Sequence, residues 1–335
     1  MLIYLIWITN IFQYLLTFIS IRIYQIFILF FFKLAKILFM EENFTIRNIS
    51  NDDLQKVTDW AKLEGFAPGI DDISIYKNTD KQGVWVGCLN DIPVGSIACV
   101  KYNSSYGFLG LFIVQKQYRN KGYGVKLWKH GLNYLKDIDC IGLEAAPIRI
   151  HDYQKWGFKK SSVTNRWKLY GNKNLPKFNF YKDSHSEFRV VPGDQISSEA
   201  VILYDSQREP SPRPHFLNDW LKNSFGLVKA IVDKNGMCHG FGRIRPCILL
   251  DDKKGWRIGP LLADTPPLAE LLIRELVGDL DNEILLDCSG LNPYANYLLS
   301  NLGFHEISKT FRMYKGIQPP TPMNQVYGLA CLELG

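Results

Sequence analysis

The residues best suited to chemistry lie together in residues 119–124, which read Arg-Asn-Lys-Gly-Tyr-Gly. An apolar run of strand length precedes them at residues 108–114, and apolar residues recur at helical spacing after them. A strand, a glycine-containing loop and a helix N-terminus are therefore predicted in that order. Glycines let the backbone turn with its N–H groups free, and the helix dipole favours negative charge at the same place. Because Arg119 and Lys121 add positive charge, the loop predicts a pyrophosphate site.

The spacing within this loop excludes two common phosphate loops. No Gly-Lys-Ser/Thr follows, as a Walker loop requires, and there is no G-x-G-x-x-G dinucleotide fingerprint. Arg119, Gly122 and Gly124 match Arg-x-x-Gly-x-Gly, which resembles the acetyl-CoA loop of the GCN5-related N-acetyltransferases (GNATs). On its own, the loop also fits a helix cap with glycines and solvated basic residues. The helices and strands predicted around the loop distinguish these two interpretations.

Those elements are predicted in the order β-α-α-β-β-β-α-β-α-β, which makes an α/β mixed sheet with helices on both faces. The strands are expected at residues 44–49, 83–89, 94–102, 106–114, 140–145 and 167–170. This is the element order of the GNAT fold, and the resemblance covers residues 60–166. It includes a Gly-Phe-x-Pro-Gly-x-x-Asp loop ending at Asp72 and Tyr-x-x-x-Gly-Phe beginning at Tyr153.

The resemblance implies an N-acetyltransferase that uses acetyl-CoA as co-substrate and needs no metal. It would transfer an acyl group to a primary amine by direct attack on the thioester. The residues that the resemblance assigns to acetyl-CoA binding are Phe112, Ile113, Val114, Arg119, Asn120, Lys121, Gly122, Tyr123 and Gly124. Tyr153 matches the tyrosine that protonates the leaving thiolate in the family. An aromatic core residue is the structural alternative for Tyr153.

The general base is less defined, because residues 108–114 contain no Glu or Asp, where many GNATs place one. Glu144 on the next strand is the candidate catalytic carboxylate, with Asp71 and Asp72 as further candidates. Each of them also fits an ordinary salt-bridged or solvated carboxylate. By analogy with the family, Asp71, Asp72, Trp85 and Tyr106 are expected to line the amine pocket.

The pattern of the first half recurs after residue 187. Residues 237–242 resemble 92–97, residues 256–262 resemble 106–112, and the segments around Gly303 and Phe311 resemble those around Gly157 and Trp167. This indicates a duplicated domain, and the second copy resembles the degenerate YitH-type GNAT domain. Residues 263–268 replace the loop with Ala-Asp-Thr-Pro-Pro-Leu, so the second half is not expected to bind CoA in the usual way.

The predicted organisation is two GNAT-like domains in tandem after a hydrophobic N-terminal segment. The boundaries are 1–39 for that segment, 44–171 for the catalytic domain, 172–187 for a linker, 188–316 for the degenerate domain and 317–335 for a tail. Residues 1–32 are apolar and long enough to span a bilayer. They also resemble translated AT-rich DNA upstream of a start at Met40. A transmembrane anchor and a misplaced start both remain open.

Composition narrows the function classes. The net charge is +6 among 335 residues, and three of these charges lie within the first forty residues, so nucleic acid is not an expected partner. The seven cysteines are scattered and suggest a reducing, cytoplasmic location, with membrane attachment only if residues 1–32 are expressed. The predicted function is acetyl-CoA-dependent acyl transfer to a small-molecule or protein amine. A non-catalytic acyl-CoA sensor or scaffold is the alternative.

Overall fold

A computed structural model describes residues 13, 17, 19–30, 43–176, 187–251 and 253–335. Chain contacts divide it into two parts, Met1–Phe44 and Thr45–Gly335. In the first part residues 19–30 are helical. No helix among the described residues is long and apolar enough to cross a membrane. Most of the predicted hydrophobic segment 1–39, and residues 177–186 of the predicted linker, lie outside the described residues.

The first half of Thr45–Gly335 builds its sheet from strands that follow one another in sequence. These are β1 (Phe44–Asn48), β2 (Val84–Leu89), β3 (Ile92–Lys101), β4 (Tyr106–Val114) and β5 (Cys140–Ala145). Its helices are α2 (Leu54–Leu63), α3 (Asp72–Thr79), α4 (Tyr123–Tyr134) and α5 (Ile150–Gln154).

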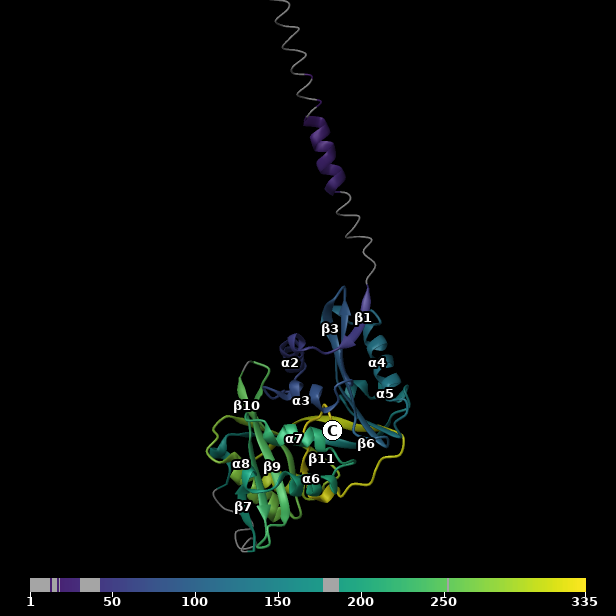
Figure 1. Cartoon of the computed structure of the whole chain (residues 1–335). Coiled ribbons are helices and arrows are strands. Elements are labelled where there is room, and N and C mark those ends of the chain that lie inside the picture. Colours follow the sequence, from purple (N-terminus) through teal and green to yellow (C-terminus); the bar gives the residue numbers. More distant parts are fainter. Residues whose placement is uncertain (1–12, 14–16, 18, 31–42, 177–186, 252) are drawn as a thin grey trace, which may run out of the picture. The chain divides into compact units, whose positions relative to one another are not determined.

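Alternating residues of β3 direct these helices to opposite faces of the sheet. Ala98 and Val100 share a hydrophobic core with α2 and α3, whereas Cys99 and Ile97 lie against Gly131 of α4. This alternation is the period of two that a strand imposes on its side chains. Figure 1 shows α2 and α3 on one side of β3, and α4 and α5 on the other.

The second half repeats this order of elements. Its strands are β7 (Arg189–Pro192), β8 (Leu227–Val232), β9 (Cys238–Ile248), β10 (Lys254–Ala263) and β11 (Glu283–Ser289). Its helices are α6 (Ser198–Ser206), α7 (Pro214–Lys222), α8 (Pro266–Val277) and α9 (Ala295–Asn301). The repeated order agrees with the duplication inferred from the sequence.

The two halves exchange their closing strands, β6 (Lys159–Tyr170) and β12 (His305–Lys315). β12 of the second half pairs with β5, and β6 of the first half pairs with β11, while β6 and β12 pair with each other. One continuous sheet therefore runs in the order β1-β2-β3-β4-β5-β12-β6-β11-β10-β9-β8-β7. The domain boundaries expected from the sequence keep each closing strand in its own half. Local patterns cannot reveal the exchange because either arrangement buries the same strand faces.

The last residues, predicted as a tail, are part of the core. After η6 (Met323–Gln325) and β13 (Val326–Gly328), residues 329–335 are almost all buried. Their backbone passes over one glycine in each half, Gly259 and Gly110. A side chain at Gly259 would collide with the Leu329 carbonyl oxygen, and a side chain at Gly110 would collide with the Glu333 carbonyl oxygen. Figure 1 shows the end of the chain near α7, where Arg213 donates a hydrogen bond to the Gly335 carbonyl oxygen at 3.1 Å.

Candidate active site

The predicted pyrophosphate loop joins β4 to α4. Gly122 is the N-cap of α4 and has a φ of 83°, a left-handed conformation that glycine adopts without strain. The first backbone hydrogen bond of the helix runs from Lys126 N to Gly122 O. The preceding N–H groups, from Tyr123 to Val125, have no acceptor within the helix and carry its positive dipole end. The loop thus has the geometry of an anion site.

Arg119 holds this loop in place. Its Nε donates to the Val114 carbonyl oxygen at 2.7 Å, and its Nη2 lies 2.5 Å from Oε1 of Glu64, which follows α2. The positive charge of Arg119 is therefore shared with a carboxylate. Lys121 is exposed beside the helix N-terminus.

An opening begins beside the loop, where β4 and β5 stop pairing. The parallel pairs run from Tyr106–Cys140 to Leu109–Leu143. Just beyond, Leu111 has a φ of 48°, and the register of β4 against β3 shifts. Ser96 fixes this bend by donating to the Leu111 carbonyl oxygen at 2.9 Å. The predicted acetyl-CoA residues Phe112, Ile113 and Val114 follow the bend, so they flank the opening.

Tyr153 reaches this region through an aromatic cluster. Its ring lies 5.0 Å from that of Trp128 on α4, and Trp128 lies 5.4 Å from Phe112. Burial raises the pKa of the Tyr153 phenol to about 12, although the charge of Arg149 opposes the rise. At neutral pH the phenol is protonated and available only as a proton donor.

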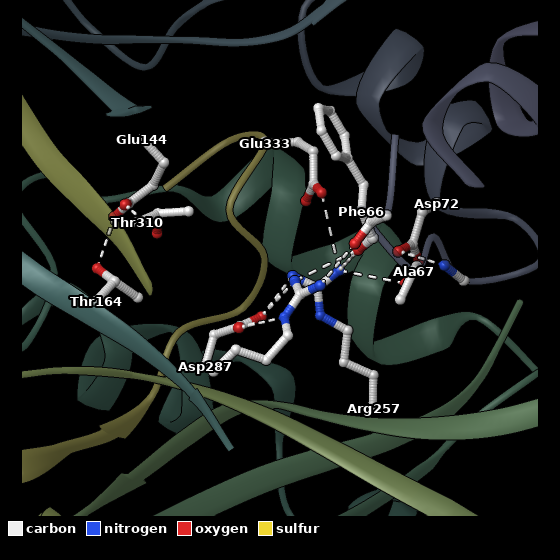
Figure 2. Close-up of polar contacts among 12 residues, drawn as sticks. Phe66, Ala67, Asp72, Glu144, Thr164, Arg257, Asp287, Thr310 and Glu333 are labelled. Carbon is white, nitrogen blue, oxygen red and sulfur yellow. Dashed lines mark hydrogen bonds and ion pairs between the residues drawn. The ribbon is translucent and has the colours of Figure 1, made fainter. Parts of the chain in front are cut away.

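Glu144 has three hydrogen-bond donors from the two exchanged strands. Thr164 and Thr310 donate to its two oxygens at 2.9 and 2.8 Å, as Figure 2 shows, and Arg312 Nε donates at 2.6 Å. A substrate amine would have to displace one of these donors before Glu144 could take its proton. The carboxylate thus lies beside the opening, but its oxygens already accept hydrogen bonds from β6 and β12 where the two halves meet.

The four residues expected to line an amine pocket are not brought together. Trp85 packs edge-on against His130 and Tyr134 of α4, on the opposite face from α3. Asp72 is buried and binds Arg245. That expectation fails because β2 alternates: Trp85 pairs with Ile97, which faces α4.

The other two members lie apart. Asp71 accepts a hydrogen bond from Asn223 at 2.9 Å. Tyr106 stacks on Tyr102 with ring centres 6.0 Å apart, and burial raises its pKa well above the usual value. Of the four predicted residues, Tyr106 is the one that lies close to Arg312 and Tyr314 at the junction.

Sequence reasoning missed a carboxylate–arginine pair that occurs once in each half. Arg312 is in register with Glu144, and Arg166 is in register with Asp287. Arg166 binds Asp287 at 2.7 and 3.0 Å, and Arg257 adds a third bond at 2.8 Å (Figure 2). Burial alone would raise the pKa of Asp287, but these two guanidinium groups hold it at about 2.

The register of the two copies explains why the pair was missed. Trp167 resembles Phe311 in sequence, but this match is two residues away from the structural equivalence of Arg166 and Arg312. Keeping the spacing from Gly157 and Gly303 constant would have aligned the arginines.

The corresponding places in the second half are already occupied by the chain. Asp264, in the position of the pyrophosphate loop, binds Arg208 at 2.6 Å and Tyr204 at 2.7 Å. β13 pairs with β10 at Leu261 and Leu262, where β10 no longer pairs with β11. Hydrogen bonds from Leu329 N to Asp287 O and from Asn292 Nδ2 to Val326 O hold this short strand on the β11 side. β13 thus fills the opening that is equivalent to the one between β4 and β5.

We therefore expect one acetyl-CoA per chain rather than two. The first half offers the N–H groups at the start of α4 and the opening where β4 and β5 stop pairing, while the second offers an ion-paired aspartate, a helix that begins with two prolines, and β13. Isothermal titration calorimetry of the full chain measures this stoichiometry directly. Binding of two acetyl-CoA molecules per chain would contradict the inference that β13 occupies the place of the cofactor in the second half.

The fold and site define a class of protein. A mixed sheet in this order, with an anion loop beside an opening between two parallel strands, is the architecture of an acyl-CoA-dependent transferase of the GNAT type. Residues 46–158 match the model described as acetyltransferase (GNAT) family, and residues 201–328 match the model described as acetyltransferase (GNAT) domain. The chain belongs to the GNAT acetyltransferases in their tandem form.

Particular relatives extend this assignment over both halves. The chain is 27% identical over 302 residues to a holothin acyltransferase of Pseudoalteromonas sp. (strain SANK 73390), a match that covers 90% of this chain and 97% of the relative. A crystal structure described as an acetyltransferase candidate of Pyrococcus horikoshii superposes with a TM-score of 0.70 at 21% identity, covering 87% and 96% of the two chains. A tandem GNAT protein from the clavulanic acid biosynthesis pathway superposes with a TM-score of 0.57 at 12% identity, covering 84% and 99%.

The family uses acetyl-CoA as co-substrate, and the loop and opening of the first half fit that molecule. The N–H groups at the start of α4, which have no acceptor within the helix, are the kind of donors that a pyrophosphate needs. The opening beside Phe112 leads from there toward Tyr153. Among the residues that the structure describes, no group of three or more His, Cys, Asp or Glu side chains is placed to hold a metal ion.

Proposed function

We propose that the first half transfers the acetyl group of acetyl-CoA to a primary amine by direct attack on the thioester. The opening between β4 and β5, flanked by the loop at Gly122 on one side and by Tyr153 on the other, is the observation that carries this proposal. The matching relative named as a holothin acyltransferase supports acyl transfer in general. The second half supplies β12 and residues 329–335 to the walls around this opening.

Each chain element has a defined task in this reaction. The N–H groups at the start of α4 bind the pyrophosphate, and backbone N–H groups near Ile113 and Val114 hold the thioester oxygen. The neutral amine attacks the carbonyl carbon, so that a C–N bond forms and the C–S bond breaks. The leaving thiolate takes the proton of Tyr153, which regains a proton from solvent, and the amine releases one proton.

The acceptor in this proposal is a small molecule rather than a protein side chain. Glu333 and Gly335 lie against Gly110 and Phe108 of β4. Phe108 also contacts Arg312, the partner of Glu144, so the end of the chain covers the sheet beside this carboxylate. A lysine on a protein surface would have to reach past this covering.

A cytoplasmic location is part of the same proposal, because all seven cysteines are buried and free.

Tyr153→Phe should lower kcat by about 10²- to 10⁴-fold, the usual contribution of a positioned acid. Acetyl-CoA affinity should stay within about twofold, since the ring and its packing on Trp128 remain. Thiol release under saturating acetyl-CoA measures the first quantity, and calorimetry the second. Tyr297→Phe on α9, where the tyrosine is 69% exposed, is the matched control.

The same two assays, applied to the wild-type protein and to Tyr153→Phe, distinguish the enzyme from the non-catalytic sensor. The sensor alternative is favoured by the commitment of Glu144 to three donors. A sensor would bind acetyl-CoA in both forms and release no thiol in either. Unchanged turnover in Tyr153→Phe would remove this side chain from the mechanism.

A further inference from the structure

A cleft opens where the two halves exchange strands. Its walls come from β6, β12, the segment between α6 and α7, and residues 318–329, and it holds about 410 Å³ of empty space that continues into solvent. Its lining combines apolar side chains, such as Leu291 and Val326, with several polar ones. The polar side chains include Ser162, Thr164, Arg208, Glu209 and Arg312.

Arg312 links this cleft to the reaction centre. It lines the cleft and binds Glu144, which follows Leu143, the last residue of β5 that pairs with β4. Its guanidinium also lies 4.9 Å from the ring centre of Phe108 on β4. Adjacent strands are about 4.8 Å apart, so the cleft begins about one strand from the opening where the thioester is proposed to lie.

The two arginines of the cleft have unused donors. Arg312 and Arg208 are 7% and 8% exposed, and Nη2 of the first and Nε of the second have no hydrogen-bond partner among the described residues. Leaving a buried charged donor unpaired is costly. A ligand with a carbonyl or carboxylate oxygen would satisfy such donors, and Ser162 and Thr164 add hydroxyl groups beside them.

Glu209 supplies the opposite charge. Within the described chain its one hydrogen-bond donor is Arg213, at 2.8 Å, and Arg213 already makes two bonds to Asp205. Burial raises the pKa of Glu209 to about 7, although Arg213 opposes the rise. Asp205 adds to the rise and Arg312 opposes it. Its second oxygen is thus left to accept from a ligand.

We propose that this cleft binds the acyl acceptor, with Glu209 holding its ammonium group and Arg312 holding a carbonyl or carboxylate oxygen of the same molecule. The inference rests on the proposed function. Glu209 accepts one proton from the ammonium group and returns it to solvent after transfer, which leaves the neutral amine that attacks the thioester. The acceptor class is therefore a small amine that carries a hydrogen-bond-accepting group.

Coenzyme A thioethers test the proposed acceptor site without requiring that the acceptor be identified first. One series carries ω-aminoalkyl chains of increasing length on the sulfur, and a matched series carries plain alkyl chains. The coenzyme part anchors both series at the loop, so that only the chain end differs. Calorimetry on the full protein should show, for at least one chain length, about tenfold tighter binding of the amine. In Glu209→Gln this preference should fall below about twofold, whereas in the exposed control Glu199→Gln on α6 it should persist.

A second measurement needs no variant. Because Glu209 ionises near neutrality, the preference of the wild-type protein for the amine should rise by up to about tenfold between about pH 6 and pH 8. Equal binding of both series at every length, or a preference that survives Glu209→Gln, would overturn the proposal. If neither series binds, the proposed coenzyme site itself is wrong, which separates the two failures.

Discussion

Gly122→Glu is expected to weaken acetyl-CoA binding by at least about 100-fold. Gly122 has a φ of 83°, where a side chain costs about 1–2 kcal/mol of backbone strain. The new carboxylate would also lie at the start of α4, where it would compete with the pyrophosphate for the same N–H groups and repel it. Calorimetric titration with acetyl-CoA measures the loss.

Gly236→Glu is the matched control for this variant. Gly236 has a φ of 81°, and an added Cβ there would have no neighbour within 4 Å, as at Gly122, but Gly236 lies in the turn between β8 and β9. Both variants should lose similar stability, and only Gly122→Glu should lose binding. Retained affinity in Gly122→Glu would show that the loop does not hold the pyrophosphate.

Asp287→Ala should destabilise the protein by about 3–5 kcal/mol, the cost of removing one partner from a buried ion pair. Asp287 is 1% exposed and binds both Arg166 and Arg257, so two buried guanidinium groups would lose their counter-charge. Urea unfolding measures the change in free energy.

An exposed ion pair provides the comparison. Asp281 is paired with Lys173, but its side chain is 59% exposed, so Asp281→Ala should change stability by less than about 1 kcal/mol.

The pKa of Asp287 in the folded chain is about 2, below its unfolded value. Its stabilisation is therefore present above the unfolded pKa and is lost as the pH falls toward 2. A loss of less than about 1 kcal/mol in Asp287→Ala would contradict the role assigned to this pair.

The sequence predicted the loop well because a local rule governs it. A strand, two glycines and a helix start can be recognised within about twenty residues, and the φ of Gly122 is what that rule requires. The duplicated order of elements also followed from strand and helix periodicity. The amine pocket was wrong at Trp85, whose side of the sheet depends on its register with Ile97.

The rest depended on contacts between residues far apart in the chain. Arg312 meets Glu144 only because β12 crosses into the first half, and no local pattern of either segment specifies that partner. Residues 326–328 read as part of a tail because three residues carry too little periodicity to indicate a strand. Their place in the second opening became visible only with β10 and β11 beside them.

The most direct test of the central claim is thiol release by the full protein with acetyl-CoA and a panel of small primary amines. Binding of one acetyl-CoA per chain, followed by thiol release with at least one amine, is the predicted result. Binding without thiol release on any amine would contradict the proposed transfer and favour a sensor. Failure to bind acetyl-CoA at all would contradict the site built from Gly122, Phe112 and Tyr153.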